Sequence, residues 1–412
     1  MMDTQLTVPL SNLMDIKHGY PFSSCYFADE PTGYILLTPR NFTKDQQIFF
    51  GENTTYYDGP VPEEFILDEG DLLLVMTDLK KEMGILGKAA ILRRDQLDKQ
   101  FSDKVILHNQ RIGKVIRKDP RSKQTFLMYL LNSDAVHKKI KATATGTTVH
   151  HTSPDKILNV RVWAPRIPEQ KKIADILSEW DRSIYLSERL IAANQQKRKA
   201  LAQKLLSGEE RFSAFSRVDW DYPRIGEIAR PITERNSGNS RDEDPLPVLS
   251  CTKYDGLMDS FRYFGKRVFS KDLSSYKVVR RGGFAYATNH IEEGSIGYQN
   301  LYDKALVSPM YTVFETSDRI VDEFLYLVLK TSRYRHIFAA NTNASVNRRG
   351  SLRWKEFAGI RVPLPPREEQ ETLIRVFSVI DREISLLGKQ QLALSRQKKG
   401  LMQKLVSGQW RV

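Results

Sequence analysis

Residues 165–208 read PRIPEQKKIADILSEWDRSIYLSERLIAANQQKRKALAQKLLSG, and residues 365–408 read PPREEQETLIRVFSVIDREISLLGKQQLALSRQKKGLMQKLVSG. The two stretches share residues at a constant offset of 200 positions. The residues that recur are Glu169-Gln170, Ser178, Asp181-Arg182, Ile184, Leu186, Lys199, Leu201, Gln203-Lys204-Leu205 and Ser207-Gly208. A self-repeat that runs for about forty residues without a gap makes each copy one structural unit. We therefore predict a protein of two related halves.

Each copy has the pattern of one long helix. No proline occurs from Glu169 to about Leu206 or from Glu369 to about Val406, and both stretches end at Ser-Gly, a common helix stop. At 1.5 Å per residue, such a helix would be roughly 57 Å long. Apolar residues recur at alternating spacings of three and four, as in the seam of a coiled coil. The seam residues are Ile173, Leu177, Trp180, Ile184, Ile191, Leu201 and Leu205 in the first copy, and Leu373, Phe377, Ile380, Ile384, Leu387, Leu394, Leu401 and Leu405 in the second.

Polar residues interrupt the middle of this seam. They are Ser187, Asn194 and Arg198 in one copy, and Gln391 and Lys398 in the other. Polar seam positions lower stability but set the register and the choice of partner. We expect the two helices to pair with each other. The alternative is that each is an amphipathic helix buried under a globular domain.

The segments ahead of the two helices differ in sequence but follow one plan. In both, short apolar strands alternate with glycine turns, and a short helix, a polar loop and a proline-closed strand then lead into the long helix. This pattern is typical of a compact, β-rich α+β domain. We expect globular domains at residues 1–165 and 213–363, and helical segments at residues 166–212 and 364–412.

Composition restricts the classes of partner. The chain has 63 Lys and Arg against 50 Asp and Glu, a net charge of +13 with a pI of about 9.5. This surplus favours a nucleic acid, a membrane surface or an acidic protein as partner, although a basic soluble protein without such a partner has the same charge. Cys25 and Cys251 occupy non-equivalent places, which argues against a disulfide framework or a thiolate zinc site. The first ten residues lack the layout of a signal peptide and no run of roughly eighteen apolar residues occurs, so we expect a cytoplasmic protein.

The sequence contains no complete catalytic motif. We find no methyl-donor glycine loop, no Asn/Asp-Pro-Pro-aromatic motif and no phosphate loop. Asp155 with Glu169 and Lys171 fits the loose pattern of metal-dependent nucleases, but Glu169 opens a helix and the second copy has Glu371 at the lysine position. The pair His150-His151 has no further ligand at helical spacing. We expect neither a catalytic centre nor a metal site in this chain.

The arrangement as a whole resembles the specificity subunits of type I restriction-modification systems, over essentially the whole chain. The resemblance is carried by the proline-plus-Glu-Gln helix starts at residues 165–170 and 363–370, the Asp-Arg-x-Ile cores at Asp181 and Asp381, and the Gln-Lys-Leu-x-Ser-Gly helix ends. Residues 226–229 (Gly-Glu-Ile-Ala) and 146–149 (Gly-Thr-Thr-Val) add to it. The second half reads Asn-Ala-Ser-Val at residues 343–346, without the glycine.

This resemblance implies an α+β protein with two β-rich target-recognition domains, separated by two long conserved helices packed as an antiparallel coiled coil with pseudo-twofold symmetry. Each domain would read one half of a bipartite duplex DNA target. The helices would space the domains and dock two methyltransferase subunits, through which restriction/translocase subunits join. The chain itself would be non-catalytic, and S-adenosylmethionine, ATP and Mg²⁺ would belong to the partners. Antiparallel pairing would also bring the two termini together and allow circular permutation.

Polar loop residues are the candidate DNA contacts, because Arg and Lys suit guanine whereas Asn and Gln suit adenine. In the first domain they are Arg40, Asn41, Lys80, Lys81, Asn109, Gln110, Arg111, Thr145, Thr147, Thr148 and His150. In the second they are Thr252, Lys253, Asn289, His290, Asn341, Thr342, Asn343, Ser345, Asn347, Arg348 and Arg349. The alternative for each is a solvated loop or turn residue. Arg280 and Arg281 are better suited to phosphates.

Other interpretations stay open at this point. A coiled-coil scaffold that joins proteins would need no DNA contacts, but the positive charge and the duplicated polar loops favour DNA binding. An active nuclease or methyltransferase would need motifs that we do not find. The aromatic residues Tyr20, Phe22, Tyr26 and Phe27 are expected in the core, with stacking on an extruded base as the alternative.

Overall fold

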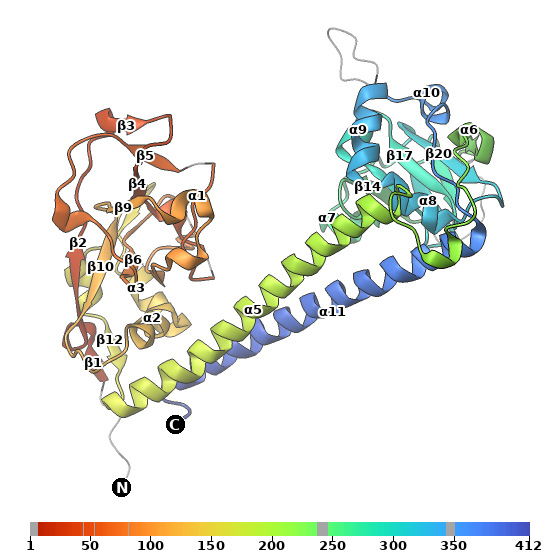
Figure 1. Ribbon diagram of the computed structural model, residues 1–412. Helices are drawn as coiled ribbons and strands as arrows, with labels where there is room; N and C mark the ends of the chain where they lie inside the picture. The colour runs from red at the N-terminus through yellow and green to blue at the C-terminus, as the bar shows by residue number, and fades with distance from the viewer. Residues whose placement is uncertain (1–6, 44, 53, 81, 237–245, 343–350) are drawn as a thin grey trace. The chain divides into compact units, whose positions relative to one another are not determined.

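The computed structural model describes residues 7–43, 45–52, 54–80, 82–236, 246–342 and 351–412 (Figure 1). The chain divides into two compact units, Met1–Glu188 with Lys389–Val412 (unit 1) and Arg189–Gly388 (unit 2). Each unit therefore combines one globular domain with part of both long helices. None of the helices in the described ranges has the length and apolar character needed to cross a bilayer.

The two long helices are α5 (Ile167–Leu205) and α11 (Arg367–Val406), which confirms the predicted helices to within two residues at either end. Each starts two residues earlier than expected, and Pro168 causes no break because proline is tolerated in a first helical turn. Each helix is followed by a glycine with positive φ, Gly208 (78°) and Gly408 (76°). Glycine adopts this conformation without steric cost and so ends a helix.

Unit 1 contains two four-stranded sheets. The main sheet has the antiparallel order β2-β10-β6-β8: Met14–His18, Ile112–Arg117, Leu72–Val75 and Ala89–Ile91. The second has the order β3-β5-β4-β9, with β4 and β9 parallel: Phe27–Ala28, Thr55–Tyr57, Tyr34–Leu37 and Val105–His108. Two short pairs are β1 (Thr7–Pro9) with β12 (Arg161–Trp163) and β7 (Thr77–Asp78) with β11 (His150–His151). The helices are α1 (Lys99–Ser102), α2 (Gln124–Asn132), α3 (Asp134–Ala142) and α4 (Pro154–Leu158), and the 3-10 turns are η1 (Leu10–Asn12), η2 (Ser24–Tyr26), η3 (Pro39–Asn41), η4 (Glu63–Phe65) and η5 (Arg94–Gln96).

Unit 2 repeats this plan. Its main sheet has the order β13-β20-β17-β18: Ala229–Ile232, Tyr311–Thr316, Phe284–Ala287 and Ile296–Tyr298. Its second sheet has the order β15-β14-β19-β16, with β14 and β19 parallel: Gly256–Asp259, Val248–Thr252, Lys304–Val307 and Lys277–Arg280. The helices are α6 (Ile225–Ile228), α7 (Ser260–Phe264), α8 (Asp322–Leu329), α9 (Ser332–Asn341) and α10 (Trp354–Ala358), with 3-10 turns η6 (Ser213–Phe215) and η7 (Ile291–Glu293). The second sheets differ at their edges, because β3 extends the first and β16 extends the second.

Each main sheet is buried on both faces. In β6, Leu72 and Leu74 pack with the helices, whereas Leu73 and Val75 pack against the second sheet. In β17, Phe284 faces the helices and Ala285 faces the second sheet. Successive side chains of a strand point to opposite faces, so a continuous apolar strand indicates a central layer.

The closing strand predicted in both halves forms fully in only one of them. In unit 1 it is β12, whereas residues 360–365 of unit 2 make isolated bridges at Arg361 and Leu364. Pro363 and Pro365 have no N–H to donate to a ladder, which accounts for the difference. The hydrogen bond beside it is the same in both units: Leu10 N to Val160 O is 2.9 Å, and Ile225 N to Ile360 O is 2.8 Å.

The ends of the long helices belong to the domain cores. In unit 1, Ile173 and Leu177 of α5 pack with Leu405 of α11 in the core of the first domain. In unit 2, Leu205 of α5 packs with Leu373 and Phe377 of α11 in the core of the second. Every predicted seam residue is buried or half-buried. Both interpretations of the apolar stripe therefore hold, each for a different part of the helix. The ends of α5 and α11 lie under the globular domains, whereas the middle of each helix pairs with the other helix.

Polar contacts set the antiparallel direction of α5 and α11 within each unit. In unit 1, Asp181 pairs with Lys398 (2.5 Å), and seven residues later Glu188 accepts a hydrogen bond from Gln391 (3.0 Å). Tyr129 of α2 also donates to Asp181 (2.5 Å), which ties the domain to the helix pair. In unit 2, Arg198 forms a two-pronged ion pair with Asp381. The polar residues that interrupt the seam, Arg198 and Lys398, are thus paired across it.

Candidate functional site

The candidate residues of unit 1 gather at one edge of its two sheets. Strands β4 and β9 run parallel with Leu37 opposite His108, so residues 39–41 and 109–111 leave the second sheet at the same edge. In the main sheet Val75 lies opposite Ile112, which brings the end of β6 to that edge. Strand β11 pairs with β7 and adds the loop of residues 145–150. The exposed candidates at this edge are Arg40, Lys80, Arg111, Thr145, Thr147 and Thr148.

A tight turn presents Arg111. The side-chain Oδ1 of Asn109 accepts a hydrogen bond from Arg111 N (3.0 Å), and the buried His108 contacts Ile112 O through Nε2 (2.8 Å). Burial lowers the pKa of His108 to about 4, so the ring is neutral and Nε2–H is the donor. The turn is therefore held by uncharged hydrogen bonds, while the exposed Arg111 supplies the positive charge.

The neighbouring turn presents Lys80. The buried carboxylate of Asp78 accepts hydrogen bonds from Lys80 N (2.9 Å) and Ile85 N (3.0 Å). Thr77 Oγ1 lies 3.1 Å from Nδ1 of His151. Two buried atoms at this edge, Gln110 Oε1 and His150 Nε2, have no hydrogen-bond partner among the described residues. Buried polar groups are usually paired, so such exceptions mark places where a ligand could supply the partner.

Two of the predicted candidates are committed to local structure. The buried Asn41 accepts hydrogen bonds from Thr38 N and Thr38 Oγ1, both at 2.8 Å, and donates to Phe49 O (3.1 Å). Asn109 closes the turn described above. Both side chains thus hold turns, and the exposed Arg40 and Arg111 stand beside them.

In unit 2 the corresponding edge is tied together by Lys330. Its Nζ donates to Lys253 O and to Gly294 O, both at 3.0 Å, which links the β14–β15 turn to η7. Thr252 is buried, and its Oγ1 accepts from Asp255 N (3.0 Å). Leu352 N bonds to Thr288 O (2.9 Å), next to Asn289 and His290, and α9 packs on η7.

The remaining candidates of unit 2 lie at or beyond the end of α9. Asn341 Nδ2 donates back to Ile337 O (2.8 Å), and Thr342 Oγ1 donates to Phe338 O (2.7 Å). Several predicted contacts lie outside the described residues: Lys81 in unit 1, and Asn343, Ser345, Asn347, Arg348 and Arg349 in unit 2.

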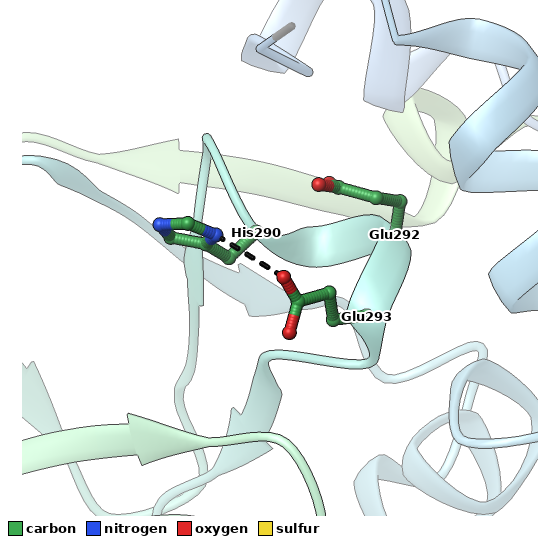
Figure 2. Close-up of side chains that lie close together, drawn as sticks. All are labelled: His290, Glu292 and Glu293. Carbon is green, nitrogen blue, oxygen red and sulfur yellow. Dashed lines mark ion pairs between the residues drawn. The ribbon is translucent and has the colours of Figure 1, made fainter. Parts of the chain in front are cut away.

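One group of potential metal ligands lies at this edge of unit 2. The ligand atoms of His290, Glu292 and Glu293 lie within 4.8 Å of one another, and no second group of three is found in the described part of the chain (Figure 2). His290 Nδ1 lies 3.5 Å from Glu293 Oε1, and both side chains are about half exposed, at 45% and 51%. Residues three apart on one helical turn meet without a metal ion. Sequence reasoning missed Glu292 and Glu293, which give this edge negative charge where unit 1 has Lys80.

Other polar residues singled out from the sequence have partners. Arg280 pairs with Glu234 and Arg281 with Asp303, each at 3.0 Å. Glu169, part of the nuclease-like pattern, is held by Arg411 (2.6 Å) at the start of α5. Of the four aromatic residues, Phe22 is buried as expected. The prediction of core packing is wrong for Tyr20, which is 37% exposed, and for Tyr26 and Phe27, which are each 43% exposed. Tyr26 and Phe27 belong to η2 and β3, and β3 is the outer strand of the second sheet.

The long helices leave apolar side chains exposed. These are Leu186 and Leu190 on α5, and Val379, Leu386 and Leu392 on α11. In unit 1, a cleft of about 1120 Å³ is lined by both helices and the first domain, with Tyr185, Leu186, Leu392 and Asn132 among its walls.

Comparison with known proteins follows the same two-part division. A family model described as "Type I restriction modification DNA specificity domain" matches residues 63–194 and 218–396. The Type I restriction enzyme MjaVIII specificity subunit of Methanocaldococcus jannaschii is 23% identical over 375 residues, covering 85% of this chain and 81% of its own. The Type I restriction enzyme EcoBI specificity subunit of Escherichia coli is 22% identical over 406 residues, covering 90% and 78%.

Two solved structures share the fold. The S subunit of the type I restriction-modification system of M. genitalium superposes with a TM-score of 0.54 at 16% identity, with 98% of each chain covered. A chain of a solved structure on complex assembly and conformational transition of the type I R-M system superposes with a TM-score of 0.55 at 16% identity. Again 98% of each chain is covered.

Proposed function

Because this chain belongs to the family of type I restriction-modification DNA specificity subunits, we propose that it selects the DNA target of such a system and reads a bipartite duplex sequence. Residues 1–165 would form the first recognition domain and residues 213–363 the second. Residues 166–212 and 364–412 would be the helical spacers. The single observation that carries this proposal is that the same sheet edge recurs in both units. The main sheets have the same strand order, but the side chains at the edge differ.

The chemistry of the two edges supports different half-sites. The first edge presents Lys80 and Arg111, which suit the guanine acceptors O6 and N7 in the major groove. The second presents Lys253 together with Glu292 and Glu293, and carboxylates accept from the amino group of cytosine. Threonines and cations around them suit phosphate oxygens, which give affinity without specificity.

In this proposal the chain is non-catalytic and its helices dock the methyltransferase subunits, one for each half-site. The exposed apolar residues on α5 and α11 and the cleft of unit 1 support a protein partner there. S-adenosylmethionine, ATP and Mg²⁺ would be bound by the methyltransferase and restriction subunits. The complex would act on cytoplasmic DNA.

The test is to co-express the chain with its neighbouring methyltransferase subunit and to map methylated adenines genome-wide by single-molecule sequencing. We expect methylation at one split motif, two short halves around a constant unspecified gap. A complex that forms but methylates without sequence preference would favour a protein scaffold. Turnover of DNA by the isolated chain would contradict the non-catalytic role.

A further inference from the structure

The segment after each long helix turns back onto the start of the other helix. In unit 1, Arg411 grips Glu169 of α5 with two hydrogen bonds, Nε to Oε1 (2.6 Å) and Nη2 to Oε2 (2.8 Å). Its guanidinium lies 5.5 Å from the ring of Trp163. Gly408 lies so close to that indole that a Cβ there would be 2.6 Å from it. We call Glu169, Trp163 and Arg411 the C-terminal latch.

Unit 2 contains the same arrangement within its own residues. Arg211 grips Glu369 of α11, Nε to Oε1 (3.1 Å) and Nη2 to Oε2 (2.6 Å), and lies 5.4 Å from the ring of Trp220. Gly208 touches that indole, with a Cβ position 3.0 Å away. We call Glu369, Trp220 and Arg211 the internal latch.

The two tryptophans are not equivalent in sequence. Trp163 precedes α5, and its counterpart 200 residues later is Pro363. Trp220 instead follows Arg211 and reaches the latch from the segment that leads into the second domain. Two unrelated positions thus place an indole against the same glycine and arginine. The glutamate, glycine and arginine recur at the constant offset of 200, and only the indole comes from a different position in each half.

The two latches differ in the solvent exposure of their ion pairs. In the internal latch the carboxylate of Glu369 is 1% exposed and also accepts from Trp220 Nε1 (2.8 Å), while Arg211 is 15% exposed and also donates to Val218 O (2.5 Å). In the C-terminal latch Glu169 is 11% exposed and Arg411 is 52% exposed. Solvent weakens ion pairs, so the C-terminal latch is the one that opens more easily.

We propose that the C-terminal latch is a positioning element that holds the end of α11 against the start of α5. In this way it fixes the orientation of the first recognition domain on the helix pair of unit 1. The argument rests on the proposed function. Trp163 ends β12, which pairs with β1 of the first domain, and Leu405 of α11 is part of that domain's core. Release of Arg411 therefore frees the helix end that supports the first domain, and the preferred gap between half-sites becomes less strict.

The experiment compares Arg411→Ala with the matched variant Arg211→Ala in the full chain. Arg230→Ala removes an exposed arginine that pairs with Glu315 and belongs to no candidate site, so it controls for loss of charge. By hydrogen exchange, Arg411→Ala is expected to speed exchange at residues 402–406 by about tenfold and to leave residues 202–206 unchanged, with the reverse pattern for Arg211→Ala. In the co-expressed methyltransferase complex, Arg411→Ala should allow gaps one base pair longer or shorter while the bases of both half-sites stay the same.

The charge swap Glu169→Arg with Arg411→Glu should restore the strict gap, which general destabilisation would not do. If Arg411→Ala does not yield folded protein, Arg411→Lys decides, because lysine keeps the charge but loses the two-pronged grip. If the wild-type complex methylates a split motif and the variants keep the same gap, the proposed role of the latch is wrong and the proposed function stands. A wild-type complex without any split motif would overturn the proposed function itself.

Discussion

At the scale of single residues, Arg111 is exposed on a turn that the buried His108 and Asn109 hold rigid. The turn fixes where the side chain of Arg111 starts, and a guanidinium suits two-pronged recognition of guanine. We expect Arg111→Ala to relax the choice of base at one position of the first half-site, by about 1–3 kcal/mol of discrimination. Binding of the assembled complex to duplexes that differ at single positions would measure this.

Arg230→Ala, in an ion pair of unit 2 outside the candidate sites, is the control and should leave the first half-site unchanged. If Arg111→Ala weakens binding to every duplex equally, Arg111 contacts a phosphate and not a base.

One buried and one half-buried histidine give unit 1 a defined response to acid. Burial lowers the pKa of His108 and of His137 to about 4, and each donates to a carbonyl through Nε2. Between pH 6.5 and 4 the unfolded chain binds these protons and the folded chain does not, so the free energy of unfolding falls as the pH falls. Replacing His137 by Gln should lower that slope by up to about 1.4 kcal/mol per pH unit. Urea unfolding at a series of pH values measures it, and an unchanged slope would contradict the prediction.

Residue type alone does not show which of the predicted side chains face outward. Asn41 and Asn109 have the chemistry of base-reading residues, yet their amides close turns. Asparagine suits both tasks, and only the backbone geometry separates them. Glu292 and Glu293 were missed for the converse reason, because acidic residues are not expected beside a polyanion.

At the scale of elements, α5 and α11 have one face turned to each other and the domain cores, and another face with exposed leucines. We expect Leu186→Ser with Leu392→Ser to reduce the affinity for the methyltransferase subunit while the melting temperature stays close to wild type, because both side chains are about half exposed. Pull-down of the co-expressed subunit and thermal unfolding measure the two effects. Equal binding by the variant would place the docking surface elsewhere.

The lengths of the two helices should set the gap between half-sites. Inserting one heptad after Glu188 and another after Gly388 keeps the seam in phase in both helices. Seven residues add about 10.5 Å, or roughly three base pairs at 3.4 Å each. Methylation mapping should then show the same half-sites with a longer gap. Altered half-sites with the original gap would contradict the spacer role.

The repeat predicted both helices to within two residues, because a gapless apolar period and a glycine stop are local signals. The same signals did not predict that the helix ends complete the domain cores. Seam residues and core residues follow one period, and only the fold shows what covers them. The latches were also missed. Their glutamate, glycine and arginine recur at the constant offset, but Trp163 and Trp220 do not, and no local signal shows that these residues meet.

At the scale of the whole molecule, both ends of the described chain belong to unit 1. Thr7 lies opposite Trp163 in the β1–β12 pair, and Gly408 packs on the same indole. A permuted chain that joins Val412 to Met1 and opens between the exposed residues Lys271 and Asp272 should therefore fold and keep the target of the wild type. Circular dichroism and methylation mapping of the permutant test this. Failure of permutants opened at several surface loops would contradict it.

The division of the chain between the units also affects the order in which they fold during synthesis. Unit 2 is one continuous segment, Arg189–Gly388, whereas the core of unit 1 needs Met402, Leu405 and Val406. Domains usually fold in the order in which the ribosome releases them. Here the domain that is made first is completed last, since its core waits for the final turns of α11. A chain interrupted shortly before its end would have a finished second unit and an open first one, and it would expose that core to chaperones and proteases.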